Sequence, residues 1–102
     1  MKEYKVGEKA HIGKNMRVKF NVNNDKNNYI TKTIKNETEV EIIKTEKIDK
    51  RYGGYAYFIK LVIDGNVLIS TYSIPQNDFF SKSQWEKKIE FENKMKELGY
   101  EI

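Results

Sequence analysis

Apolar and polar residues alternate along much of the first half of the chain, a pattern typical of strands that bury one face. In the clearest example, Val18, Phe20 and Val22 share one face, and the residues between them are polar. The asparagine-rich segment 23–28 contains no apolar residue and predicts a surface loop. The pattern predicts four strands before residue 50, at residues 9–12, 17–22, 29–34 and 38–48.

The least polar part of the chain is YFIKLVIDGNVLISTYS, residues 57–73, whose only charges are Lys60 and Asp64. Within it, Asp64-Gly65 or Gly65-Asn66 is a strong signal for the turn of a β-hairpin. Both alternating faces of this hairpin are largely apolar. We therefore expect it to be buried on both sides, by the sheet on one face and by another element on the other.

The last segment has the period of a helix. Ser83 followed by Glu86 forms a capping box and Gly99 provides a stop, which together predict a helix at about residues 84–98. About half of its circumference is apolar, through Trp85, Ile89, Phe91, Met95 and Leu98. Five or six strands and one terminal helix predict a mainly β, α+β fold. The expected architecture is a small antiparallel barrel at about residues 5–80 with the helix packed on it.

The length of 102 residues predicts one domain, residues 1–102. The chain has no cysteine and one histidine, His11, so we expect no disulfide, no metal site and no cofactor. No run of eighteen apolar residues occurs, and the first residues lack the apolar core of a signal peptide. We therefore expect a cytoplasmic protein that does not associate with membranes.

Candidate catalytic groups are few. The serines have only His11 as a base, and no Gly-x-Ser-x-Gly turn presents one of them. Glu37, Glu39 and Glu41 would lie about 6 to 7 Å apart on one strand face, a separation that could support two-carboxylate hydrolysis. Such a row is more commonly a solvated strand face that resists aggregation. We expect no enzymatic activity.

The net charge of +4 is distributed unevenly. The first 36 residues hold nine Lys and Arg against three Asp and Glu, whereas the remainder holds ten against twelve. A local positive field indicates an anionic partner, although alternating cations on a strand are also typical of an ordinary exposed face. The candidate phosphate contacts are Lys14, Arg17, Lys19, Lys26, Lys32 and Lys35. Since arginine is scarce, nucleic-acid binding would show little sequence preference.

Four tyrosines lie within 21 residues, and tyrosine suits surfaces that are part apolar and part wet. The candidate partner-binding residues are Tyr52, Tyr55, Tyr57 and Tyr72. Such rings can hold peptides or single-stranded nucleic acid. The alternative is that some of these rings, Tyr57 and Tyr72 above all, close the barrel as part of its core.

The segment 73–79, SIPQNDF, resembles the Pro-x-Asn-aromatic segment of Src-homology-3-like barrels, in which a 3₁₀ turn leads to the last strand. The order of a long polar loop, a strand pair and a central hairpin also resembles this family over about residues 16–80. Bacterial members bind cell-wall peptides and other partners, so the resemblance implies a binding module. The family's tryptophan after the second long loop is missing, since the only tryptophan is Trp85.

Our preferred hypothesis is a non-enzymatic binding module that docks a protein or peptide partner. The lysine- and asparagine-rich composition suits a bacteriophage or mobile element of an AT-rich Gram-positive host, where the protein would modulate host machinery. The alternative is a nucleic-acid-binding protein that uses the basic N-terminal third with little sequence specificity.

Overall fold

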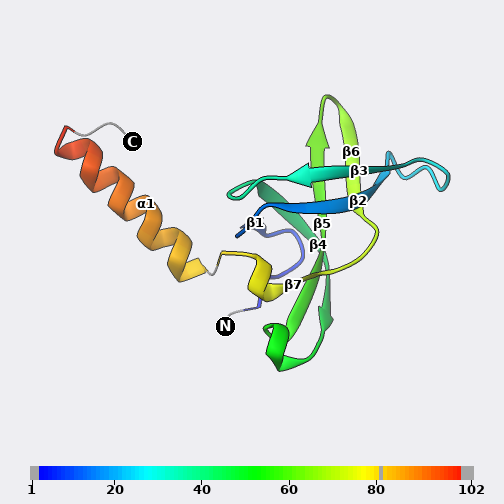
Figure 1. The fold of residues 1–102 in the computed structure, drawn as a ribbon, viewed down its shortest axis with the longest axis horizontal. Helices are drawn as coiled ribbons and strands as arrows, with labels where there is room; N and C mark the ends of the chain where they lie inside the picture. The colour runs from blue at the N-terminus through cyan, green and yellow to red at the C-terminus, as the bar shows by residue number, and fades with distance from the viewer. Residues whose placement is uncertain (1–2, 81, 100–102) are drawn as a thin grey trace.

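The computed structural model describes residues 3–80 and 82–99 as a curved antiparallel sheet followed by one helix (Figure 1). The strands are β1 (Lys9–His11), β2 (Met16–Val22), β3 (Tyr29–Ile34), β4 (Glu39–Lys47), β5 (Tyr55–Ile63), β6 (Asn66–Ser70) and β7 (Ile74–Pro75). The helices are the 3₁₀ turns η1 (Lys50–Tyr52) and η2 (Gln76–Asp78) and the α-helix α1 (Lys82–Glu97). The prediction of a mainly β fold with a C-terminal helix is confirmed.

The sheet has the order β1-β4-β5-β6-β2-β3, with β7 pairing on β5. Figure 1 shows β2 and β3 crossing steeply over β5 and β6, so the sheet folds over itself into two layers. The core lies between these layers, where Val18 and Phe20 of β2 join Ile59 and Leu68 of β5 and β6. Because β1 and β3 end the order without pairing with each other, the sheet is not closed.

The predicted hairpin is present, and Asp64-Gly65 is its turn. Both residues have positive φ, +51° and +78°, as a two-residue type I′ turn requires. The turn sets Leu61 opposite Leu68, with both side chains toward the core. The prediction that the second face of the hairpin is covered is wrong, because Val62 on that face is 61% exposed.

Helix α1 differs from its expected position. Only its first two turns contact the sheet among the described residues, and the remainder projects away (Figure 1). Phe91 and Leu98 are therefore 62% and 64% exposed. The reason lies in the apolar stripe, which Lys88 interrupts, and the Lys88 ammonium pairs with Glu37 instead of being buried. The helix begins at Lys82, and the side chain of Ser83, and with it the capping box, lies outside the described residues.

A buried hydrogen-bond cluster around the Tyr57 hydroxyl fixes the N-terminal segment and η2 to the sheet. The Tyr57 hydroxyl accepts the Tyr4 N–H at 3.0 Å and donates to the Gln76 side-chain oxygen. Burial raises the pKa of Tyr57, so the hydroxyl keeps its proton for this second bond. The rings of Tyr4 and Phe79 contact the Tyr57 ring edge-on, with centroids 5.4 and 5.5 Å away.

We expect Tyr57→Phe to lower the free energy of unfolding by about 1–3 kcal/mol, because it leaves a buried amide N–H and a buried amide oxygen without a partner. The matched control is Tyr72→Phe, which removes an exposed hydroxyl bonded to the Arg17 carbonyl and should change stability by less than about 0.5 kcal/mol. Urea unfolding measures both variants. An equal loss of unfolding free energy in the two variants would contradict this role of the Tyr57 hydrogen bonds.

Candidate binding surfaces

The structure separates the four candidate tyrosines. Tyr57 is fully buried in the core, where its ring cannot contact a partner directly, and Tyr55 is half-buried against the core. Tyr52 on η1 and Tyr72 after β6 are 53% and 47% exposed. The hydroxyl of Tyr72 donates to the Arg17 carbonyl at 3.0 Å, so this ring lies beside β2. The accessible rings belong to two different loops.

The loop that carries Tyr52 is held firmly against η2. The Asp49 carboxylate caps η1 by accepting the Arg51 N–H at 2.9 Å. Gly53 has φ +105°, and a Cβ at this position would lie 2.9 Å from the Asn77 side-chain oxygen. The Asn77 amide in turn donates to the Arg51 carbonyl at 3.3 Å. Tyr52 is therefore presented at a fixed place on the surface.

The six candidate cations do not share one face. Lys14 forms an ion pair with Asp78 at 3.0 Å, so its charge is already balanced. Within residues 3–80 and 82–99, no ion pair is formed by the other five: Arg17, Lys19, Lys26, Lys32 and Lys35. The first two lie on the outer face of β2, whereas Lys32 is on the opposite face of the hairpin, because it pairs with the buried Val18.

The outer face of the β2–β3 hairpin combines cations with an aromatic ring. The register places Arg17 opposite Thr33 and Lys19 opposite Thr31, so these side chains share the outer face. The Lys19 ammonium lies 4.9 Å from the ring centre of Tyr29, within range of a cation–π interaction. Neither β2 nor β3 contains an acidic residue. The surface is therefore positive, with an accessible tyrosine at its end.

The row of glutamates is not a free carboxylate site. Glu37 has φ +76° in the turn before β4, so the prediction that it shares a strand face with the other two is wrong. Each carboxylate has a basic side chain beside it: Glu37 pairs with Lys88, Glu39 lies next to the His11 imidazole, and Glu41 lies between Lys9 and Lys60. This arrangement is typical of a structural strand face.

His11 attaches α1 to the sheet. Its ring stacks on the Trp85 ring with centroids 3.7 Å apart and an interplanar angle of 13°. The Glu39 carboxylate lies 3.5 Å from its Nε2 atom. Burial lowers the pKa of His11 and Lys88 adds to this effect, while Glu39 partly opposes it. The neutral imidazole is therefore the form that suits the folded protein.

Because the folded protein binds a proton at His11 less readily than the unfolded chain does, stability is greatest above the unfolded pKa near 6.5. It should decline as the pH falls below about 6.5, before most carboxylates titrate. Urea midpoints and Trp85 fluorescence between pH 7.5 and 5.5 measure this decline. In His11→Gln the decline should disappear, and a wild-type midpoint that rises on acidification would contradict the sign.

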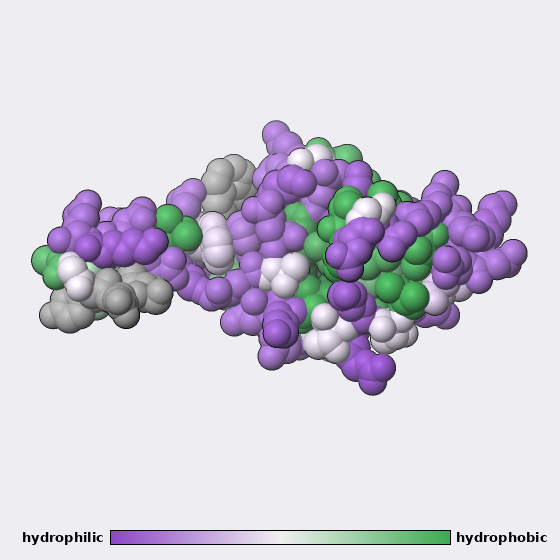
Figure 2. Space-filling view, turned by 90° about the horizontal axis from the view of Figure 1, so that it is seen from above, coloured by the Kyte–Doolittle hydropathy of each residue, from purple (hydrophilic) through white to green (hydrophobic). Residues whose placement is uncertain are grey.

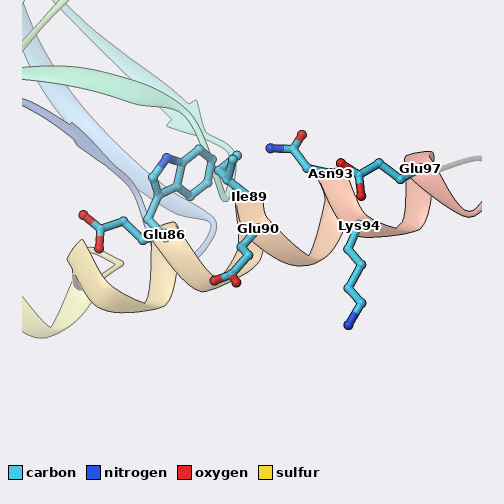
Figure 3. Close-up of a pocket in the computed structure, with 7 residues that line it drawn as sticks. Glu86, Ile89, Glu90, Asn93, Lys94 and Glu97 are labelled. Atoms are coloured by element: carbon cyan, nitrogen blue, oxygen red, sulfur yellow. The ribbon is translucent and has the colours of Figure 1, made fainter.

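A shallow depression runs beside α1, and Figure 3 shows the residues that line it. All of them belong to the one helix: Trp85, Glu86, Ile89, Glu90, Asn93, Lys94 and Glu97. Ligand pockets are normally concave and have a few converging polar groups. A single helix face cannot enclose a ligand, so this depression is not a small-molecule site.

Comparison of the chain with protein-family models, with curated proteins and with solved structures gives no match. Over the described ranges 3–80 and 82–99, no three His, Asp or Glu side chains gather as metal ligands would. In the same ranges no helix is long and apolar enough to cross a membrane.

Proposed function

We propose that this protein is a non-enzymatic binding module that docks a protein or peptide partner. The observation that carries the proposal is the uncovered apolar stripe of α1, where Phe91 and Leu98 are 62% and 64% exposed. A single exposed apolar side chain is ordinary in any protein. Phe91 on α1 and Leu98 in the turn directly after it are seven residues apart, a spacing that places two side chains on the same side of a helical segment.

The anchoring of α1 makes it suitable for docking. The His11–Trp85 stack and the Lys88–Glu37 ion pair hold its first two turns on the sheet. The following turns project away from the sheet (Figure 1), and the side chains of Phe91 and Leu98 there are exposed. An amphipathic helix that is already formed loses little conformational entropy when a partner's groove covers its apolar face.

We also propose that the sheet is a Src-homology-3-like barrel, open along one side. The proposal is supported by the β4–β5–β6 meander and by η2, which follows β7 and leads to Phe79. Phe79 forms a bridge with Ile12 beside β1, where the last strand of such a barrel would pair. The lysine- and asparagine-rich composition supports the further proposal that this is a cytoplasmic protein of a bacteriophage or mobile element.

We expect the double substitution Phe91→Ser and Leu98→Ser to lower partner capture from a host lysate at least tenfold, because it removes the apolar contact. Stability should change little, since both side chains are exposed. The matched control is Glu90→Ser with Glu97→Ser, which has the same spacing on another face of α1. The measurement is affinity capture in the presence of nuclease, followed by quantification of the retained protein.

Equal capture by the two double variants would contradict docking through α1. Capture that nuclease abolishes would contradict a protein partner altogether. Tyr52→Ala provides a separate comparison, because its ring lies on η1 and would contribute only if the partner also covers that loop.

A second candidate function is single-stranded nucleic-acid binding on the outer face of the β2–β3 hairpin. The specific observation is the Lys19–Tyr29 contact beside Arg17 in two strands without an acidic residue. Bases stack on exposed aromatic rings while neighbouring cations contact phosphates. The backbone would supply most of the affinity, so little sequence preference is expected.

If the second candidate is correct, a labelled oligothymidylate should bind in a strongly salt-dependent manner. For about three phosphate contacts, affinity should fall roughly 20-fold between 50 and 200 mM salt. The slope of log affinity against log salt concentration reports the number of phosphate contacts. Lys19→Ala should lower this slope by the share of about one contact, and Tyr29→Ala should weaken binding without changing the slope. The measurement is fluorescence anisotropy, with Lys60→Ala on another part of the sheet as control. Affinity that does not respond to salt would rule this function out.

A further inference from the structure

Strand β3 is a free edge of the sheet. Among the residues that the structure describes, it pairs on one side only, with β2, and ends the strand order. The Val22 N–H donates to the Asn28 carbonyl at 2.9 Å. Val22 and Asn28 are therefore a hydrogen-bonded pair of the β2–β3 ladder. Because such pairs alternate in an antiparallel ladder, the hydrogen-bonded residues of β3 are Ile30, Lys32 and Ile34. The backbone N–H and C=O groups of the remaining β3 residues, Tyr29, Thr31 and Thr33, therefore point away from β2, toward the open edge.

The opposite edge of β2 supports this assignment. The Lys19 carbonyl accepts the Thr71 N–H at 3.0 Å, and the Arg17 carbonyl accepts the Tyr72 hydroxyl. Both carbonyls therefore point toward β6 and away from β3. Their partners across the ladder, Thr33 and Thr31, are left with N–H and C=O groups directed to the outside.

A cleft accompanies this edge on the inner side of β3. It is lined by apolar side chains and, in one of its two parts, also by the polar side chains of Asn23, Asn28, Asp64 and Asn66. Lys32 and Ile63 border two adjoining depressions, one toward each end of the strand. The apolar residues of the two depressions are Val22, Ile30, Ile34, Leu61, Ile63 and Leu68. Ile30 is 41% exposed, so the cleft is open to solvent. Figure 2, seen from the side of the β5–β6 turn, shows apolar residues exposed on the sheet and framed by hydrophilic ones.

We propose that β3 accepts an extended peptide as an additional strand of the sheet, with apolar residues at alternate positions and an acidic residue opposite Lys32. The outward backbone groups supply the hydrogen bonds, as in other cases of strand addition. The cleft takes the apolar side chains, and Lys32, which has no ion pair among the described residues, takes the carboxylate. This inference goes beyond the proposed function, because it adds a second docking surface, at β3, to the one on α1.

The positive charge of the β2–β3 hairpin favours an acidic peptide at this edge over a second copy of the same chain. Strands β2 and β3 carry Arg17, Lys19 and Lys32 and no acidic residue. Two copies joined along β3 would bring these positive charges together, which is unfavourable. A nucleic acid would use the outer face, where the cations and Tyr29 lie, and would leave the cleft unfilled.

The test uses the full chain, labelled with ¹⁵N, and three synthetic peptides. The first, Thr-Val-Thr-Glu-Thr-Val-Thr, matches the inner face of β3 with an acid between two apolar residues. The second replaces its glutamate by lysine, and the third replaces both valines by serine. We expect the first to bind at least tenfold more tightly than either control. Amide hydrogen exchange at Tyr29, Thr31 and Thr33 should slow on binding, whereas exchange at Ile30, Lys32 and Ile34 should change little.

The matched variants are Thr31→Pro and Thr31→Val. Proline removes an outward N–H that β2 does not use, so the folded sheet should persist while strand addition is blocked. Valine keeps the N–H and should bind like the wild type. Lys32→Glu should reverse the preference between the glutamate and lysine peptides, which tests the charge contact independently of proline. A folded Thr31→Pro variant that binds normally would overturn the proposal.

Other occupants give distinct outcomes, each of which overturns the proposal. Slower exchange at these amides on raising the protein concentration alone would indicate a second copy. The same slowing with an oligothymidylate, but not with the peptides, would indicate nucleic acid. Failure of all three peptides together with normal capture through α1 would overturn strand addition and leave the proposed function standing.

Discussion

The arrangement of the binding surfaces depends on the hydrogen bonding of β2 along both edges. One edge pairs with β3 and the other with β6, which folds the sheet into two layers around the core. Asn23, with φ +51°, fixes this corner, since its N–H donates to the Val67 carbonyl at 2.8 Å and its side-chain oxygen accepts the Val67 N–H at 2.8 Å. Within the described part of the chain, β3 is therefore paired on one side and unpaired on the other.

Much of the fold could be predicted because local patterns specify it. The alternation of Val18, Phe20 and Val22 predicted the buried face of β2. The pairs Asp64-Gly65 and Gly65-Asn66 located the hairpin turn, and the structure selects the first of them. The packing of α1 could not be predicted in this way. Apolar periodicity shows that a helix has a face to bury, but which surface covers that face depends on complementary shape and charge elsewhere. Here Glu37, in a turn with positive φ, pairs with Lys88 and sets where the helix is anchored.

The candidate sites were less predictable than the fold, because closeness in sequence is not closeness in space. Tyr55 and Tyr57 are neighbours on one strand face, yet only Tyr57 is fully buried, since its hydroxyl finds Tyr4 and Gln76 from distant segments. Tyr29 shows the converse, because it is ten residues from Lys19 in the sequence and beside it in space. Its contact with Lys19 depends on the register of the β2–β3 hairpin, which the asparagine-rich loop sets and the alternation alone does not.

Lys32 connects the stability of the fold with its proposed selectivity. An exposed edge strand risks pairing with other chains, and an inward-pointing charge is one way in which proteins prevent this. In β3 that charge lies between Ile30 and Ile34, so a purely apolar strand would have to bury an unpaired ammonium when it adds to the edge. A strand with a carboxylate at the matching position avoids this cost. The same side chain that prevents aggregation would then admit one class of partner, because protection and recognition both follow from the desolvation of a single charge.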